Sequence, residues 1–151
     1  MGYYLRYFVT DERGVSLSVL ESSLKQYNVA YSIERDDKAD DEGDLQFNGD
    51  LYGAIEINRP DDDLFDEEIG ELKEFLEDAE GERKSEVLQV LDDAKAIVAV
   101  QVLWATRNAN ETLEIINPLW LWLYANRKGL AKTDDRGYYD ASGLVLEVKR
   151  K

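Results

Sequence analysis

The chain has 151 residues and a formal net charge of −15, and it contains neither cysteine nor histidine. This length allows one domain to bury a core without disulfides, and the missing residue types exclude disulfides, zinc–thiolate sites and catalysis with an imidazole base. We therefore expect no metal site and no cofactor. Because no secretion signal and no long apolar window is present, we also expect a soluble, cytoplasmic protein without membrane contact.

The acidic residues are concentrated in one part of the chain. Residues 34–86 contain 22 Asp and Glu against 6 Lys and Arg, a net charge of −16. Such a segment repels nucleic acid and anionic membranes, and it attracts cations and basic proteins. We therefore expect no nucleic-acid partner. The alternative interpretation is a solvated surface that maintains solubility or suits a salt-rich habitat.

The first predicted element is a strand from Tyr3 to Thr10, an uninterrupted apolar and aromatic run that is typical of the centre of a sheet. A helix capped by Ser16 should follow it. The inward stripe of that helix is predicted to be Leu17, Leu20, Leu24 and Tyr27. Residues Val29 to Glu34 then predict a second strand.

Residues 35–44 include only one apolar residue, an alanine, and predict a mobile acidic loop. An EF-hand does not fit this loop, because Lys38 would occupy the position of the first carboxylate ligand. Asn48 and Gly49 are typical of a type I′ hairpin, although the odd-numbered apolar residues around them would also suit one long bent strand. We favour a hairpin with Tyr52 to Asn58 as its principal strand.

A second helix is predicted to begin at Asp63. Its core stripe, within about 80° on the helical wheel, consists of Phe65, Ile69, Leu72, Leu76 and Ala79. Its opposite side carries four acidic residues without an intervening base, the acidic ridge, which consists of Glu67, Glu71, Glu74 and Asp78. Like charges at these spacings destabilise a helix. The ridge therefore predicts a surface for a basic partner, with solubility as the alternative explanation.

A shorter helix is predicted at Ser85 to Lys95. The apolar run from Ala96 to Ala105 predicts the most buried strand of the sheet. Asn108 and Glu111 resemble a capping box that opens a short helix, which we expect Pro118 to break or kink.

The segment Asn117 to Gly129 predicts a central helix, because its apolar side chains point in every direction around the axis. Asn117 is its expected N-cap and Gly129 its end. Trp120 and Trp122 project about 200° apart on the helical wheel, so one packing layer cannot easily cover both. An exposed tryptophan here would predict a homodimer through this helix.

Short antiparallel strands are predicted from Leu130 to Val148, followed by a frayed basic tail at 149–151. The elements together predict an α+β fold in a single domain, residues 1–151, with a mostly antiparallel mixed sheet and helices packed largely on one face. Their order suggests two strand-helix-strand-strand modules.

The chain carries none of the motifs for dinucleotides, P-loops, zinc proteases, serine hydrolases or thioredoxins. A pair of carboxylates could still catalyse glycoside hydrolysis, but no spacing supports one, so we assign no catalytic residue. Our leading hypothesis is a non-catalytic binding protein that recognises a basic protein through the acidic ridge, as an inhibitor, an immunity protein or a nucleic-acid mimic. The alternative is a small-molecule-binding module with an aromatic cleft. The candidate cleft residues are Trp104, Trp120, Trp122, Tyr124, Tyr138 and Tyr139.

Overall fold

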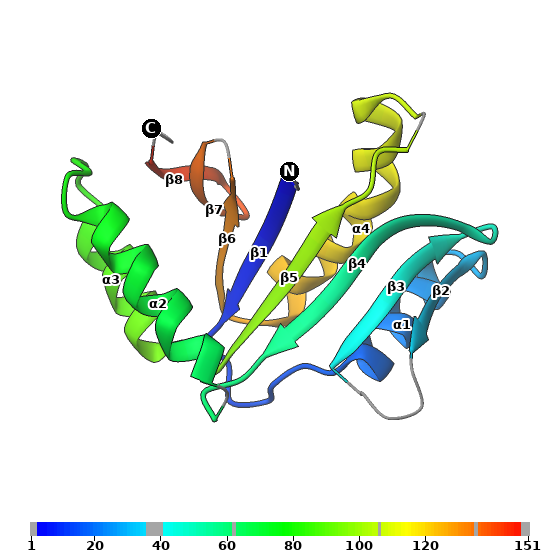
Figure 1. The fold of residues 1–151 in the computed structure, drawn as a ribbon, viewed down its shortest axis with the longest axis horizontal. Coiled ribbons are helices and arrows are strands. Elements are labelled where there is room, and N and C mark those ends of the chain that lie inside the picture. The colour runs from blue at the N-terminus through cyan, green and yellow to red at the C-terminus, as the bar shows by residue number, and fades with distance from the viewer. Residues whose placement is uncertain (1–2, 36–40, 62, 106, 135, 149–151) are drawn as a thin grey trace.

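The computed structural model describes the chain except residues 1–2, 36–40, 62, 106, 135 and 149–151 (Figure 1). Its strands form one eight-stranded antiparallel sheet in the order β2-β3-β4-β5-β1-β6-β7-β8. The strands are β1 (Tyr3–Val9), β2 (Tyr31–Arg35), β3 (Glu42–Phe47), β4 (Asp50–Asn58), β5 (Ala96–Val102), β6 (Gly129–Thr133), β7 (Gly137–Asp140) and β8 (Gly143–Glu147). The helices are α1 (Leu17–Tyr27), α2 (Asp63–Leu76), α3 (Lys84–Asp93) and α4 (Ala109–Asn126).

The centre of the sheet is formed by β1 and β5, which pair with each other along their whole length. Every residue of β5 except Gln101 is buried. Both strands carry apolar side chains in succession, so both of their faces must be covered. The predicted central strand at Tyr3 and the predicted buried strand at Ala96 are therefore confirmed.

The α+β class and the antiparallel sheet are confirmed, but the helices lie on both faces instead of largely on one. Leu5, Tyr7 and Val9 of β1 belong to the core beneath α1 and α4, whereas Phe8 belongs to the core beneath α2 and α3. Figure 1 shows the α2–α3 pair on one side of the sheet and α1 with α4 on the other. The reason is strand alternation. Successive strand residues point to opposite faces, so the consecutive apolar residues Tyr7, Phe8 and Val9 require cover on both faces.

Both strand-helix-strand-strand segments are present in chain order, as β1-α1-β2-β3 and β5-α4-β6-β7. They are interleaved in the sheet, because β1 lies between β5 and β6. The helices α1 and α4 share one face, and α2 and α3 form an inserted pair on the other.

The helix α4 is continuous through Pro118, so the predicted break before a separate central helix is wrong. Asn108 caps α4 by accepting a backbone N–H at 2.8 Å, while Asn117, the predicted cap, lies in the helix interior. Proline lacks the N–H that would bond the carbonyl of Glu114, and Glu114 is exposed, so water can reach this carbonyl.

Within the described residues, neither α4 nor any other helix has the length and apolarity needed to cross a membrane.

The predicted acidic loop at 35–44 is too long. Arg35 ends β2. Gly43 and Asp44 pair with both β2 and β4, and Glu42 pairs with β4, because neighbouring strands satisfy their backbone groups. Residues 36–40 and the predicted tail at 149–151 lie outside the described residues.

The predicted hairpin is confirmed, since Asn48 and Gly49 have φ values of 53° and 82°, as a type I′ turn requires.

Candidate functional site

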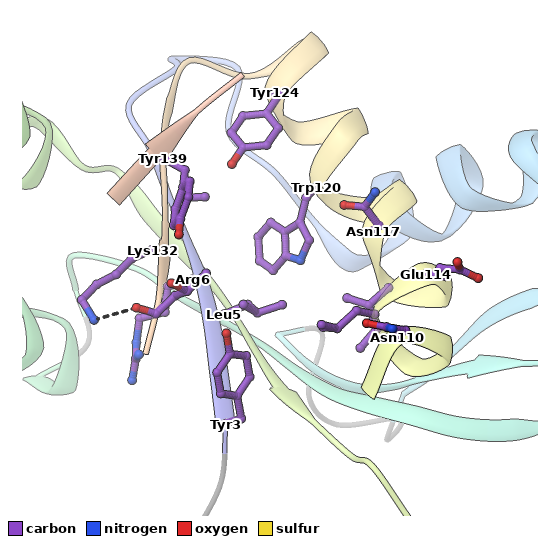
Figure 2. A pocket seen from close by; sticks show the side chains of 14 residues that line it. Tyr3, Leu5, Arg6, Asn110, Glu114, Asn117, Trp120, Tyr124, Lys132 and Tyr139 are labelled. Atoms are coloured by element: carbon purple, nitrogen blue, oxygen red, sulfur yellow. Dashed lines mark hydrogen bonds between the residues drawn. The ribbon is translucent and has the colours of Figure 1, made fainter. Parts of the chain in front are cut away.

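A pocket of about 500 Å³ lies between α4 and the strands β1, β6 and β7 (Figure 2). Its position follows from the arrangement of the helices. On this face α1 contacts β2, and α4 contacts β4 and β6. No further helix of the described chain covers the face, so β6 and β7 flank a space beside α4.

The floor of the pocket comes from side chains on adjacent strands. Leu5 of β1 pairs with Thr133 of β6, and Ala131 of β6 pairs with Tyr139 of β7. Directly paired residues point to the same face of a sheet, so these four side chains lie together beneath α4. The small side chain of Ala131 leaves volume that a larger residue would occupy.

The wall of the pocket is one side of α4. Its lining residues are spaced three or four positions apart, which brings them onto one helical face. They are Asn110, Leu113, Glu114, Ile116, Asn117, Trp120 and Tyr124.

Four aromatic side chains surround the space, namely Tyr3, Trp120, Tyr124 and Tyr139 (Figure 2). The ring of Tyr7 supports two of them, at 6.4 Å from Trp120 and 5.6 Å from Tyr124. Burial raises the pKa of Tyr124 to about 12. Its phenol is therefore protonated at neutral pH and can donate a hydrogen bond.

Two buried polar atoms of the pocket side chains have no hydrogen-bond partner in the described structure, Trp120 Nε1 and Thr133 Oγ1. Trp120 is only 7% exposed. An unpaired buried donor costs about 1–3 kcal/mol. The described residues contain four such side-chain atoms, and two of them belong to this one pocket.

The mouth of the pocket is polar. Asn110, Glu114 and Asn117 are exposed, and no hydrogen bond or ion pair engages their side chains within the described part of the chain. The guanidinium of Arg6 extends to the opposite face of the sheet, where it binds Glu68 at 2.5 Å and Asp134 at 3.0 Å. The charge of Arg6 is thus neutralised away from the pocket.

The structure brings together only part of the aromatic group predicted from the sequence. Trp120, Tyr124 and Tyr139 line the pocket. Trp104 does not line it, but its ring lies 5.7 Å from that of Tyr3, which does. Trp104 therefore packs behind a residue that lines the pocket, without lining the pocket itself.

Trp122 and Tyr138, the other two predicted cleft residues, lie elsewhere. The guanidinium of Arg127 lies 5.0 Å from the ring of Trp122. Tyr138 is buried in the opposite core, where its ring contacts Phe8 at 5.9 Å. Tyr138 and Tyr139 are separated because successive strand residues point to opposite faces.

Sequence reasoning missed the polar lining and Tyr3. The spacing of Asn110, Glu114 and Asn117 places all three on one face of a continuous helix. That signal was hidden because Pro118 predicted two separate helices. The contributions of Tyr3 and Thr133 carry no local signal, since their places depend on strand pairing.

The acidic ridge lies on the other side of the sheet. Glu67, Glu71 and Glu74 are exposed on α2, and Asp78 is exposed just beyond its C-terminal end. Two apolar side chains of the same helix, Leu64 and Phe75, are 61% and 69% exposed. The ridge is separated from the pocket by the sheet itself.

Within the described ranges, acidic side chains form no group that could hold a metal ion. Comparisons with protein-family models, with curated proteins and with solved structures find no match.

Proposed function

We propose that this protein is a small-molecule-binding module whose ligand occupies the pocket between α4 and strands β1, β6 and β7. The observation that carries the proposal is a space of about 500 Å³ beside α4 that is lined by four aromatic side chains, those of Tyr3, Trp120, Tyr124 and Tyr139. Ligand pockets commonly have volumes of 300–1,000 Å³, apolar walls and a few polar groups.

The test uses the indole N–H resonances of the three tryptophans, assigned with single Trp→Phe variants. A chemically broad set of small molecules is added to the ¹⁵N-labelled protein, and melting temperature is measured in parallel. We expect a ligand to shift the resonance of Trp120 and to raise the melting temperature, because it binds only the folded state. The resonance of Trp122 should change little.

Matched variants on α4 provide the control. Trp120→Phe should weaken ligand binding about threefold to tenfold, because the smaller ring removes part of the aromatic contact with the ligand. Trp122→Phe, two residues away and outside the pocket, should leave the affinity unchanged. If no compound shifts Trp120 or stabilises the protein, the proposed function is wrong.

A second candidate function is binding of a basic protein through the acidic ridge. It is favoured by exposed apolar side chains beside the acids, since Leu64 and Phe75 lie on α2 with 61% and 69% of their surface accessible. Glu67, Glu71 and Glu74 make no ion pair within the described residues. Apolar anchors within a charged surface are typical of protein interfaces.

This second function can be tested by charge reversal. Glu67→Lys combined with Glu74→Lys should abolish capture of a basic partner from cell extract. Glu12→Lys combined with Glu111→Lys changes the net charge equally at exposed positions outside α2, and it should retain the partner. Equal capture by the two double variants would refute the role of the ridge.

A further inference from the structure

We infer that the pocket binds an organic cation of the quaternary ammonium class, in which the alkyl groups on the nitrogen contact the aromatic rings. This inference rests on the proposed function of the pocket and names the chemistry of its ligand. Three properties of the site lead to it: the arrangement of the rings, the direction of the charged side chains and the apolar floor.

The four aromatic side chains come from three separate elements. Tyr3 belongs to β1, Tyr139 to β7, and Trp120 and Tyr124 to α4. The rings of Trp120, Tyr124 and Tyr139 do not stack on one another in the described structure. Figure 2 views Tyr139 edge-on, so one face of its ring is turned toward Trp120 across the space. A cation over the face of such a ring is attracted by the ring quadrupole.

The two basic lining residues direct their charge away from these rings. Arg6 pairs directly with Lys132 across β1 and β6, so both side chains point away from the face beneath α4, as Figure 2 shows. On the opposite face they line a groove together with Glu68 and Asp134. Both carboxylates bind Arg6, and the ammonium of Lys132 lies 3.4 Å from the carbonyl oxygen of Thr133. The interior of the pocket therefore receives neither positive charge directly.

The electrostatic potential at the rings favours positive charge. Burial raises the pKa of Tyr124 to about 12, and the carboxylate of Asp140, which binds Arg83 at 3.0 Å, adds to this rise. A negative potential that disfavours the phenolate also favours a bound cation. The chain as a whole carries −15, which attracts cations from solution.

The same site favours a quaternary nitrogen over a primary amine. Glu114 is the acidic residue among the described lining residues, and Figure 2 shows its carboxylate pointing away from the rings. A primary ammonium has three N–H donors that need acceptors, whereas a trimethylammonium group has none. Its methyl groups suit an apolar floor formed by Leu5, Ile116 and Ala131. The space of about 500 Å³ admits such a group with a further substituent.

A neutral aromatic or alkyl compound is the main competing ligand chemistry, because it would contact the same rings and the same floor. Contact between a ring and a hydrocarbon does not depend on charge, whereas the cation–π interaction does. The decisive comparison is therefore between a cation and a neutral compound of the same shape.

The experiment titrates the ¹⁵N-labelled protein with choline and with phenyltrimethylammonium. Matched arms use 3,3-dimethyl-1-butanol and tert-butylbenzene, the neutral isosteres in which carbon replaces nitrogen, and further arms use ethanolamine and benzoate. We expect at least one quaternary cation to shift the indole resonance of Trp120, with little change at Trp122. That cation should bind about tenfold more tightly than its neutral isostere.

Tyrosine variants test the contribution of the rings. Tyr139→Leu should weaken cation binding about fivefold to tenfold, because the ring quadrupole is lost, and Tyr139→Phe, which retains a ring, should weaken it less. Tyr3→Leu, on a different strand, should weaken binding by a similar factor to Tyr139→Leu. Tyr27→Leu is the control, since Tyr27 is 72% exposed on α1 and outside the lining. Circular dichroism verifies that each variant is folded.

The outcomes separate this inference from the proposed function. Equal affinity for a cation and its neutral isostere would overturn the quaternary ammonium inference and leave the pocket as a ligand site. Binding of another compound at Trp120 without binding of either cation would do the same. Unchanged cation binding by Tyr139→Leu and Tyr3→Leu would show attraction by net charge alone and would also overturn it. If no compound of any class moves Trp120, the inference and the proposed function both fail.

Discussion

Two threonines, Thr112 and Thr133, show how the effect of a hydroxyl on stability depends on whether it has a hydrogen-bond partner. The hydroxyl of Thr112 donates to the carbonyl of Asn108 at 3.1 Å, whereas that of Thr133 has no partner in the described structure. Thr133→Val should therefore raise the free energy of unfolding of the ligand-free protein by about 1 kcal/mol, and Thr112→Val should lower it by about 1 kcal/mol. Urea denaturation measures both. Equal destabilisation by the two variants would show that Thr133 is satisfied in solution.

Asp11 should make stability depend on pH in the acid range. The carboxylate is 8% exposed and accepts hydrogen bonds from the guanidinium of Arg13 at 2.8 and 3.0 Å. These bonds, followed by one from the Arg13 backbone, hold the pKa of Asp11 well below its ordinary value of 3.8. A carboxyl with a lowered folded-state pKa stabilises the protein above its unfolded-state pKa, and this stabilisation is lost as the pH falls further.

The variant Asp11→Asn tests this pH dependence. The difference in free energy of unfolding between the protein and Asp11→Asn should be constant from pH 7 to about pH 5 and should shrink progressively at lower pH. Glu12→Gln, an exposed neighbour, serves as the control for general charge effects. A difference that stays constant down to pH 2 would contradict the lowered pKa of Asp11.

Two glycines, Gly70 and Gly129, show that the space and the backbone conformation at a position decide whether a side chain is tolerated there. A Cβ added at Gly70 in α2 would meet no atom within 4 Å, so Gly70→Ala should raise the free energy of unfolding by about 0.5–1 kcal/mol. Gly129, the first residue of β6, has φ +155°, and a Cβ there would overlap the backbone carbonyl of Phe8. Gly129→Ala should lower the free energy of unfolding by about 2 kcal/mol or more. Opposite signs in urea denaturation are the expected result, and stabilisation by both would contradict the close approach at β6.

The charge of the whole molecule should make its stability depend on salt. The acidic segment 34–86 includes β3, which lies next to the edge strand β2, and the helix α2, and Figure 1 places β3 and α2 on opposite sides of the molecule. Self-repulsion destabilises a compact state, and 0.1 M salt screens charges beyond about 10 Å. The melting temperature should therefore rise between low and moderate sodium chloride. A flat response would remove the repulsion argument, and saturation by calcium but not magnesium would indicate a specific cation site instead.

A homodimer through α4 stays a prediction, but neither tryptophan of the helix provides the strongly exposed surface on which the prediction was based. Trp120 is buried and Trp122 is partly covered, with Arg127 over its ring. Leu121, which lies between the two tryptophans in the sequence, is strongly exposed, with 58% of its surface accessible. Sedimentation at micromolar concentration tests the prediction, and Leu121→Glu should yield monomer if the contact exists. A monomer before substitution would show that α4 is covered within one chain.

The sequence by itself determined the features that depend only on residues close together in the chain. Ser16 accepts the predicted N-cap hydrogen bond of α1, and Asn48 and Gly49 form the predicted turn, because capping and turn geometry involve only a few adjacent residues. The α+β class followed from the periodicity of apolar residues. Tyr27 was misplaced by the same rule. It continues the stripe of α1 but is 72% exposed, since it lies in the last turn, where the helix no longer faces the core.

Only the tertiary structure decided which residues come together in the pocket. Tyr3 and Thr133 lie near opposite ends of the chain and share one pocket, because β6 pairs with β1 although four helices and four strands lie between them in the sequence. The continuity of α4 through Pro118 depends on packing against the sheet, which outweighs one lost hydrogen bond. Local preferences cannot encode such contacts. The sequence could therefore name Trp120, Tyr124 and Tyr139 as cleft candidates, while strand order and face decided that Trp122 and Tyr138 lie elsewhere.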